Sequence, residues 1–424
     1  VLAAPASAGR PAAGGKGGKP RVVVAVVDTG INPYHEFFHA GGSLYKRSAP
    51  SGVTRQVLRE LGIDKDHVIR LTRTGNFEAD FKKDSAQFDN IKKGEPYWFE
   101  GTNVIGISFQ DERRLRPDGN ASPHGIGTSG AVLAANPDAI VVAVEGINNE
   151  SEEWAFTHPA VDIVSTSYGP VTSIPTLNHL SFSYTGVVQN GKVHLGAAAN
   201  DPTWASLDET SGPWWTVGIA GYQEGTTEGR QLMSANFPDF VGDFTQDLPY
   251  CRSCEKDTQS VSGTSFATPR SAGTFSKVLL EARRAARHRG GIVTKGVDLP
   301  LLVKGKLSFT NWEARRALEQ AAYYPGVGDY QPGAEGTFDL TSVPVVDAAP
   351  WLQTGWGAIT PDPEHGVIKE ALALLGVKGK PDRSKSAEAC EFMTANIAAR
   401  HAYWDNAAVF GESFGTSADP YIYC

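Results

Sequence analysis

Two histidines and a glutamate form the first stretch of this 424-residue chain whose spacing suggests chemistry. His35-Glu36-Phe37-Phe38-His39 has the HExxH pattern, which on a helix places two zinc ligands one turn apart beside a glutamate base. The stretch begins two residues after Asn32-Pro33, where we expect a turn, and Tyr45 stands where the extended motif has a third histidine. A zinc metalloprotease using His35, Glu36 and His39 therefore remains the alternative enzyme.

The sequence Asp28-Thr29-Gly30 begins a second pattern, the signature of aspartic proteases. That chemistry needs two carboxylates that share a proton, and the second usually comes from another Asp-Thr-Gly or Asp-Ser-Gly. Neither sequence recurs in the chain, and a small dimeric half would not need 424 residues. We therefore set an aspartic protease aside.

The third pattern combines Asp28 with His124, in PHGIGTSGAVLAANP, and Ser265, in GTSFATPRSAG. Acyl transfer to a serine needs an acid that orients a histidine, a histidine that takes the hydroxyl proton, and the serine itself. Each residue alone has a structural explanation: a turn aspartate, a half-buried histidine and a serine that caps a helix. Together they predict a nucleophilic serine.

Apolar runs that end in glycine or polar residues precede several of these positions. Because helical-length segments separate several of the runs, we predict an α/β fold with a mostly parallel, doubly wound sheet. Ligands bind beyond the carboxyl ends of such strands, where Asp28, Ser167 to Gly169 and Asn200 are expected. The runs are RVVVAVVDTG (21–30), NVIGISF (103–109), AIVVAVEG (139–146), VDIVSTSYG (161–169), KVHLGAAAN (192–200) and WTVGIAG (215–221).

These motifs resemble the subtilisin-like serine proteases, the subtilases. The resemblance rests on VVDTGIN around Asp28, His-Gly at 124–125 before small residues, and GTSFATP around Ser265, in the order Asp, His, Ser. It covers about residues 21–376 and implies a three-layer fold with helices on both faces of the sheet. It also explains His35-Glu36 as a variant of a surface turn that follows the family's aspartate.

The resemblance assigns a role to each site residue. Ser265 would attack the peptide carbonyl, His124 would act as general base and then general acid, and Asp28 would hold the imidazole. Asn200 and the Ser265 backbone N–H would bind the oxyanion. An extended polypeptide substrate would lie along Ser167, Tyr168 and Gly169.

The chain also departs from the family pattern. Ile126 and Thr128 differ from the usual residues after the histidine, and Ala199 stands where glycine is usual. Asp28 and His124 are 96 residues apart, several times the usual separation, which indicates an inserted surface segment at about 34–102. We expect this segment to border the cleft and to make the endopeptidase selective.

The helix after Ser265 has its own predicted limits. Gly263 allows the sharp turn into the helix, and Pro269 is expected in the first turn, where a missing N–H costs little. We predict that the helix runs to about Arg289, with Arg283 and Arg284 near its negative pole. Trp204, Trp214 and Trp215 lie, by resemblance, near the specificity pocket, although core packing is the expected role of at least two.

The four cysteines allow three pairings if all are oxidised. Cys251 and Cys254 could instead be half of a zinc site, but no second CxxC completes it. We predict disulfides Cys251–Cys254 and Cys390–Cys424, the second tethering the tail at 377–424. The small-x-small pattern Ala6-Ser7-Ala8 predicts the end of a secretion signal, although a disordered linker is the alternative for 1–20.

Composition excludes other function classes. The net charge of −8 comes with no dense block of Lys or Arg, which argues against a nucleic-acid partner, and no apolar run is long enough to span a membrane. We therefore expect a secreted enzyme that needs no cofactor, and the resemblance allows structural calcium. A catalytically silent, peptide-binding protein of the same fold is the non-enzymatic alternative, and oligomeric state is not encoded in any motif.

Overall fold

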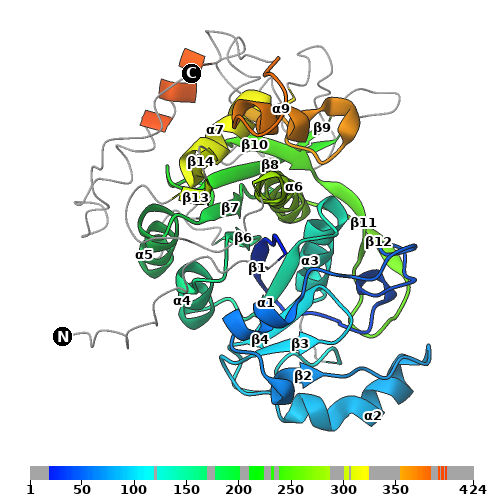
Figure 1. The fold of residues 1–424 in the computed structure, drawn as a ribbon. Coiled ribbons are helices and arrows are strands. Elements are labelled where there is room, and N and C mark those ends of the chain that lie inside the picture. Colours follow the sequence, from blue (N-terminus) through cyan, green and yellow to red (C-terminus); the bar gives the residue numbers. More distant parts are fainter. Residues whose placement is uncertain are drawn as a thin grey trace, which may run out of the picture.

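A computed structural model of the chain shows a ten-stranded sheet crossing the molecule, with helices on both faces (Figure 1). Several predictions concern residues outside the part that the structure describes. These are residues 1–18, Trp204, Cys424 and most of the tail at 377–424. The described residues are 19–118, 122–169, 177–200, 210–223, 231–233, 238–286, 300–304, 307–323, 354–382, 390–391, 393–395 and 397–398.

The main sheet has the strand order β10-β8-β7-β6-β1-β5-β4-β3-β2, and β9 pairs with β8. All neighbours are parallel except the pairs β3–β4 and β8–β9, which are antiparallel. The six predicted runs are confirmed as six of these strands. The bounds are β1 (Val23–Asp28), β2 (Val68–Ile69), β3 (Pro96–Phe99), β4 (Val104–Ser108), β5 (Ile140–Glu145), β6 (Ile163–Thr166), β7 (Val193–Ala197), β8 (Val217–Gln223), β9 (Gln231–Met233) and β10 (Phe240–Asp243).

The helices and two small hairpins complete the described part of the chain. The α-helices are α1 (Arg55–Glu60), α2 (Phe77–Asp89), α3 (His124–Ala135), α4 (Asn149–Thr157), α5 (Leu177–Tyr184), α6 (Thr264–Ala285), α7 (Asn311–Ala321) and α9 (Val367–Leu374). Short 3-10 helices are η1 (Glu36–Phe38), η2 (Lys65–His67) and η7 (Pro363–His365), and η3 (Thr185–Gln189) is a π-helix. The hairpins pair β11 (Thr245–Pro249) with β12 (Thr258–Ser262), and β13 (Pro300–Lys304) with β14 (Leu307–Thr310).

The alternation of β1 side chains explains the three layers. Val24 and Val26 belong to one apolar core together with residues of α3 and α6, whereas Val23 and Val27 belong to a second core with residues of α1 and α4. A strand buried on both faces needs apolar residues at successive positions, and the run at 21–30 has this pattern. The predicted three-layer architecture is therefore confirmed.

Residues 34–102 are more deeply integrated than a surface excursion. They supply β2 and β3, which extend the main sheet beyond β4. Phe88, Tyr97 and Phe99 from this segment are buried in the same core as α3 and α6. The aromatic residues that suggested a surface segment in the sequence are therefore packing residues, and β3 and β2 form one edge of the sheet, beyond β5 and β4 from the central strand β1 (Figure 1).

Helix α6 corrects one prediction, because it ends at Ala285 rather than near Arg289. Arg283 and Arg284 lie in its last turn, as predicted, and Arg283 is fully buried there. Its guanidinium donates to both carboxylate oxygens of Asp162, at 2.7 and 2.9 Å. Removing one partner of such a buried pair costs about 3–5 kcal/mol, because the other charge is left uncompensated. This pair therefore anchors α6 beneath the sheet.

The predicted core role of the tryptophans is confirmed for the two that are described. Trp214 and Trp215 are both buried and contact each other edge to face, with ring centroids 5.6 Å apart. Trp214 also stacks on Trp312 of α7, and the Trp215 indole N–H donates to Ser183. They brace α7 against the sheet. Within the described residues, no helix is long and apolar enough to cross a membrane.

Candidate active site

The candidate residues meet where three neighbouring parallel strands end. Asp28 is the last residue of β1, Ser167 follows β6 directly, and Asn200 lies three residues after β7. Two helix starts face the same edge, since His124 is the first residue of α3 and Ser265 the second of α6. Parallel strands place their carboxyl ends at one edge, so the topology gathers residues far apart in the sequence.

His124 is paired with Asp28, as predicted. The imidazole Nδ1 lies 2.9 Å from both carboxylate oxygens of Asp28. The carboxylate also accepts hydrogen bonds from the Thr29 backbone N–H, at 2.7 Å, and from the Thr128 hydroxyl, at 3.1 Å. Asp28 is almost fully buried, whereas the His124 side chain keeps 24% of its surface exposed. With Nδ1 donating to Asp28, the Nε2 lone pair of neutral His124 is left to act as a base.

Burial and Asp28 act in opposite directions on the pKa of His124. Burial lowers it, but the hydrogen bond and the charge of Asp28 together outweigh burial, so the pKa of His124 is raised above its ordinary value of 6.5. The Asp28 carboxylate therefore makes the His124 imidazole a stronger base than a free imidazole.

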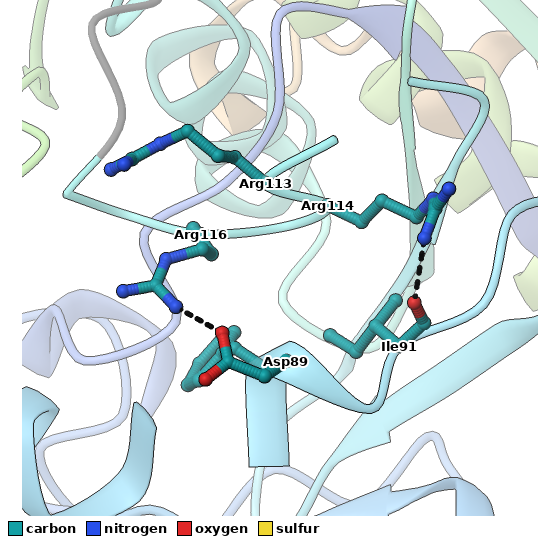
Figure 2. A pocket seen from close by; sticks show the side chains of 6 residues that line it. Asp89, Ile91, Arg113, Arg114 and Arg116 are labelled. Carbon is teal, nitrogen blue, oxygen red and sulfur yellow. Dashed lines mark hydrogen bonds and ion pairs between the residues drawn. The ribbon is translucent and has the colours of Figure 1, made fainter. Parts of the chain in front are cut away.

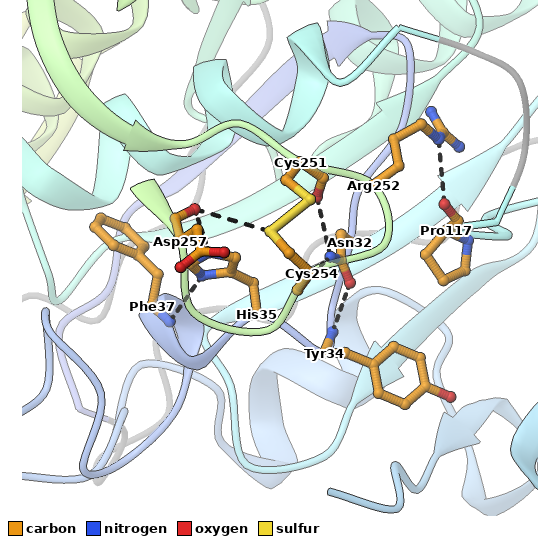
Figure 3. Close-up of a disulfide and its surroundings, with 9 residues drawn as sticks. All are labelled: Asn32, Tyr34, His35, Phe37, Pro117, Cys251, Arg252, Cys254 and Asp257. Atoms are coloured by element: carbon orange, nitrogen blue, oxygen red, sulfur yellow. Dashed lines mark hydrogen bonds between the residues drawn. A yellow bond between two sulfur atoms is a disulfide. The ribbon is translucent and has the colours of Figure 1, made fainter. Parts of the chain in front are cut away.

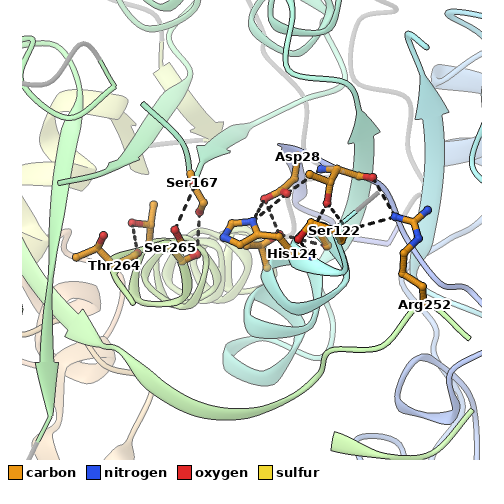
Figure 4. A network of polar contacts seen from close by, with 11 residues as sticks. Asp28, Ser122, His124, Ser167, Arg252, Thr264 and Ser265 are labelled. Carbon is orange, nitrogen blue, oxygen red and sulfur yellow. Dashed lines mark hydrogen bonds and ion pairs between the residues drawn. The ribbon is translucent and has the colours of Figure 1, made fainter. Parts of the chain in front are cut away.

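Ser265 lies at the start of α6, after the turn that Gly263 makes with a φ of +147°. Its hydroxyl donates to the Ser167 carbonyl at 3.2 Å (Figure 4). The Ser265 hydroxyl therefore donates to Ser167 rather than to His124 Nε2 among the described residues. Such bonds are often long or misaligned in substrate-free enzymes.

Pro269 does not lie where it was predicted, and a second hydrogen bond between Ser167 and Ser265 compensates for its position. Pro269 is the sixth residue of α6, so it lies in the second turn rather than the first. There its missing N–H leaves the carbonyl of Ser265, four residues earlier, without its helical donor. The Ser167 hydroxyl supplies a substitute at 2.8 Å (Figure 4). The proline thus joins the helix of Ser265 to the segment after β6.

Asn200 contacts the first turn of α6. Its Oδ1 accepts from the backbone N–H of Thr264, at 2.9 Å, and from the Thr264 hydroxyl, at 2.8 Å. Because both partners can donate, the amide orientation is fixed, and Nδ2 remains as a donor on this exposed residue. Ala199, where glycine was expected from the family, has a φ of +63°, a conformation that costs a residue with Cβ about 1–2 kcal/mol.

The HExxH stretch does not form a zinc site. Glu36–Phe38 is a 3-10 turn and His39 has an extended backbone, so the two imidazoles do not share a helix face. Each ring instead contacts a backbone carbonyl through Nε2: His35 that of Asp257 at 3.1 Å, and His39 that of Pro33 at 2.6 Å. Burial lowers the pKa of both rings, that of His39 to about 4. No metal-binding group of three His, Cys, Asp or Glu occurs among the described residues.

The predicted disulfide between Cys251 and Cys254 is present and faces this histidine turn (Figure 3). Nδ2 of Asn32 donates to the carbonyls of both cysteines, at 3.0 and 2.8 Å. The CRSC sequence is therefore a closed loop rather than half of a metal site. Cys390 is buried, but Cys424 lies outside the described residues, so the second disulfide remains a prediction.

A cavity of about 350 Å³ lies between the end of α2 and the loop after β4 (Figure 2). Arg114 donates to the Ile91 carbonyl, and Arg116 pairs with Asp89. The lining arginines are thus held by acceptors of the protein itself, and we assign no ligand here. The lining residues are Phe88, Asp89, Ile91, Arg113, Arg114 and Arg116.

No contact in this site was assigned from the sequence to three residues: Thr29, Thr128 and Arg252. Thr128 lies four residues after His124 on one helix face, so its contact with Asp28 could have been anticipated from spacing. The Thr29 hydroxyl bridges the Ser122 carbonyl, at 2.8 Å, and the Gly125 N–H, at 3.0 Å. Nothing in the local sequence indicates Arg252, which comes from a distant hairpin.

Two comparisons with known proteins bear on this geometry. The sequence profile of the subtilase family matches residues 19–289, which is well over half of the chain and contains all of the candidate site residues. No curated protein matches the chain.

Similar solved structures are proteases of low sequence identity. The prenylagaramide maturation protease PagA has 13% identity and a TM-score of 0.47, with 85% of this chain and 96% of that chain covered. A lanthipeptide protease has 14% identity and a TM-score of 0.47, with 83% and 88% covered. Fervidolysin from Fervidobacterium pennivorans, a keratinolytic enzyme related to subtilisin, has 13% identity and a TM-score of 0.43, with 82% and 42% covered.

Proposed function

The chain belongs to the subtilase family, and from that premise we propose that this subtilisin-like serine protease cuts internal peptide bonds with Asp28, His124 and Ser265. The observation that carries the proposal is the Asp28–His124 pair, which leaves Nε2 free on a ring next to the helix that bears Ser265. His124 and Phe266, the residue after Ser265, have ring centroids 5.3 Å apart. A turn of the Ser265 side chain away from Ser167 would direct its hydroxyl toward the base.

The reaction would proceed in two halves. Ser265 Oγ attacks the peptide carbonyl carbon while its proton passes to His124 Nε2, and Asp28 stabilises the imidazolium that forms. Collapse of the tetrahedral intermediate breaks the C–N bond, and His124 gives its proton to the leaving amine. Water then repeats the sequence on the acyl-enzyme, releasing the acid and restoring Ser265.

The oxyanion would be bound by two donors at the start of α6. Asn200 Nδ2 is one, because Oδ1 is occupied by Thr264, and the backbone N–H of Ser265 is the other. Donors held in place before the reaction stabilise the developing charge without reorganisation, and the loss of one costs about 10² to 10³ in turnover.

The substrate would lie extended along Ser167, Tyr168 and Gly169. The Ser167 carbonyl accepts a hydrogen bond from the Ser265 hydroxyl in the substrate-free protein, and a substrate N–H would replace that donor. When a substrate N–H takes this carbonyl, the Ser265 hydroxyl is released toward His124. Tyr168 is fixed by a hydrogen bond from its hydroxyl to Glu152, at 2.8 Å.

Secretion and selectivity form the finer part of this proposal. The Cys251–Cys254 disulfide supports secretion, because disulfides persist in oxidising compartments. The loop after β4 supports selectivity through its contact with Arg252. This arginine donates to the carbonyls of Arg116 and Pro117 in the loop. It also donates to the carbonyls of Thr29 and Ser122, which lie next to Asp28 and close to His124. This loop, rather than the far sheet edge formed by β2 and β3, would border the substrate path.

A peptidyl phosphonate probe tests the proposal, because it labels only an activated serine. The native protein and the His39→Gln variant should be labelled with or without a metal chelator, whereas Ser265→Ala should not. Asn200→Asp keeps an acceptor for the Thr264 N–H but removes the donor, so it should lose turnover by about 10² or more with little loss of stability. Absence of labelling in the native protein would sink the proposal in favour of a silent peptide-binding protein.

A further inference from the structure

The hairpin that leads into α6 carries a loop at residues 250–257, here called the clasp loop, between β11 and β12. Arg252 lies in this loop, and its side chain reaches across to backbone carbonyls on three separate segments. It donates to Arg116 at 2.8 Å and to Pro117 at 3.3 Å, the second bond being drawn in Figure 3. It also donates to Ser122 at 3.2 Å (Figure 4) and to Thr29 at 3.5 Å. These four bonds use most of the five N–H donors of the guanidinium.

Two of these carbonyls flank the proposed catalytic pair. Thr29 follows Asp28, and Ser122 lies two residues before His124, whose backbone N–H donates to the Ser122 hydroxyl. The Thr29 hydroxyl also donates to the Ser122 carbonyl, so this carbonyl receives hydrogen bonds from both Thr29 and Arg252. Arg252 therefore contacts the backbone on both sides of the Asp28–His124 hydrogen bond without contacting either side chain.

The clasp loop is itself fastened to the chain beyond Asp28. Asn32 donates to the carbonyls of Cys251 and Cys254 (Figure 3), and the Glu36 N–H donates to the Glu255 carbonyl at 2.6 Å. The disulfide closes the loop around Arg252, which limits the positions that the arginine backbone can take. The histidine turn at 35–39 is thus a docking surface for the clasp loop.

Helix α3 packs closely on the same hairpin because two of its residues are glycines. A Cβ at Gly127 would come within 2.8 Å of the Tyr250 ring, and one at Gly130 within 2.8 Å of Pro249. The helix that begins with His124 is therefore seated directly on the hairpin that holds Arg252. Movement of the clasp loop would displace the start of α3 relative to β1.

We propose that Arg252 is a positioning residue that sets the Asp28–His124 geometry through the Thr29 and Ser122 carbonyls, and that the Cys251–Cys254 disulfide holds it there. The proposal rests on the proposed function. Its charged neighbours are Glu145, Asp118 and Arg113, and none of these contacts the imidazole. The effect of Arg252 on catalysis is therefore expected through geometry rather than through its charge.

Arg252→Gln and Arg252→Lys test this, with Arg284→Gln as the matched control on the surface of α6. Because small displacements in an active site can cost about 100-fold, we expect kcat of Arg252→Gln to fall about 10- to 100-fold with KM nearly unchanged. Arg252→Lys, which keeps a donor but not the fork, should fall less. The double variant Cys251→Ser/Cys254→Ser should show the same pattern with a smaller decrease, and Arg284→Gln should match the native enzyme.

A readout independent of turnover separates positioning from general destabilisation. The His124 Nδ1 proton shared with Asp28 should give a strongly downfield NMR signal, which should broaden or move in Arg252→Gln at a temperature where the variant is folded. The pH at which kcat/KM falls on the acid side should also decrease, because a weaker Asp28 contact raises the pKa of His124 less. A native-like signal and kcat in both Arg252 variants would overturn the proposal, as would a loss confined to KM.

The two proposals fail in different ways. If the native protein is not labelled by the phosphonate, the proposed function is wrong, yet the NMR signal still reports whether Arg252 positions the pair. If the native protein is labelled and Arg252→Gln reacts at the native rate, only the role of Arg252 is wrong.

Discussion

Two histidine segments of this chain carry similar residue types but differ in what holds their rings. In the turn at 35–39, both imidazoles contact backbone carbonyls through Nε2 and are buried. At the start of α3, the His124 ring contacts the Asp28 carboxylate through Nδ1 and remains half-buried. Burial lowers the pKa of His39 to about 4, whereas the pKa of His124 is raised above 6.5.

The difference shows that the partner of the ring decides its chemistry. A carbonyl oxygen accepts a hydrogen bond but carries no full charge, so a buried ring beside it stays neutral and structural. A carboxylate fixes the tautomer and stabilises the protonated ring, so the other nitrogen can accept and return a proton. A motif that specifies residue types without specifying these partners cannot distinguish the two cases.

The same substitution in each segment gives the largest test of this difference. His124→Gln removes the proposed base and should lower kcat by about 10⁴-fold or more, because no other group among the described residues is placed to take the Ser265 proton. Single-turnover acylation with a peptidyl ester measures this step directly. A variant within tenfold of the native rate would show that His124 is not the base.

Asp28→Asn tests the partner rather than the ring. Its amide cannot stabilise the imidazolium, and kcat should fall by about 10⁴-fold. Removing the Asp28 charge also removes what raises the pKa of His124, so the residual activity should persist to lower pH than native activity does. In the native enzyme, kcat/KM should fall as pH drops through a pKa above 6.5. A pH profile with the same acid limb in both proteins would contradict the pairing.

His39→Gln should affect stability and leave kcat unchanged. The native imidazole has a pKa of about 4 when folded and 6.5 when unfolded, so the unfolded chain binds more protons between these values. Stability is then lost as pH falls from 6.5 to 4, by roughly 3 kcal/mol from this residue. Denaturant unfolding at several pH values should show a flatter pH dependence in the variant, which keeps a donor for the Pro33 carbonyl but does not titrate.

Treatment with a zinc chelator should have the smallest effect on activity. Because His35 and His39 do not share a helix face, a strong zinc chelator should leave kcat/KM of the native enzyme unchanged within error. Elemental analysis of the same sample should find no stoichiometric zinc. Loss of activity on chelation, restored by added zinc, would reverse the assignment of the two segments.

Much of the fold and the site follows from local sequence. The run at 21–30 is apolar on both faces, so it predicts a central strand, and the Thr-Gly that ends it places Asp28 at the carboxyl edge. Gly263 and the small residues after Ser265 predict a turn into a helix, which α6 confirms. The family match at 19–289 contains the same short motifs. The packing role of residues 34–102 does not follow from local sequence, because their aromatic side chains become core residues only when β2 and β3 join the sheet.

The sequence by itself determined which residues are available for chemistry and that Asp28 ends a buried strand and Ser265 begins a helix, because these depend on neighbours along the chain. Only the tertiary structure decided which histidine meets a carboxylate, that CRSC closes into a loop against the histidine turn, and that Arg252 bonds to carbonyls up to 223 residues away. Ala199 at a positive φ and Pro269 opposite the Ser167 hydroxyl belong to the same group. Their physical reason is shared: each hydrogen bond or strained backbone angle is fixed by contacts between distant segments, which no local pattern encodes.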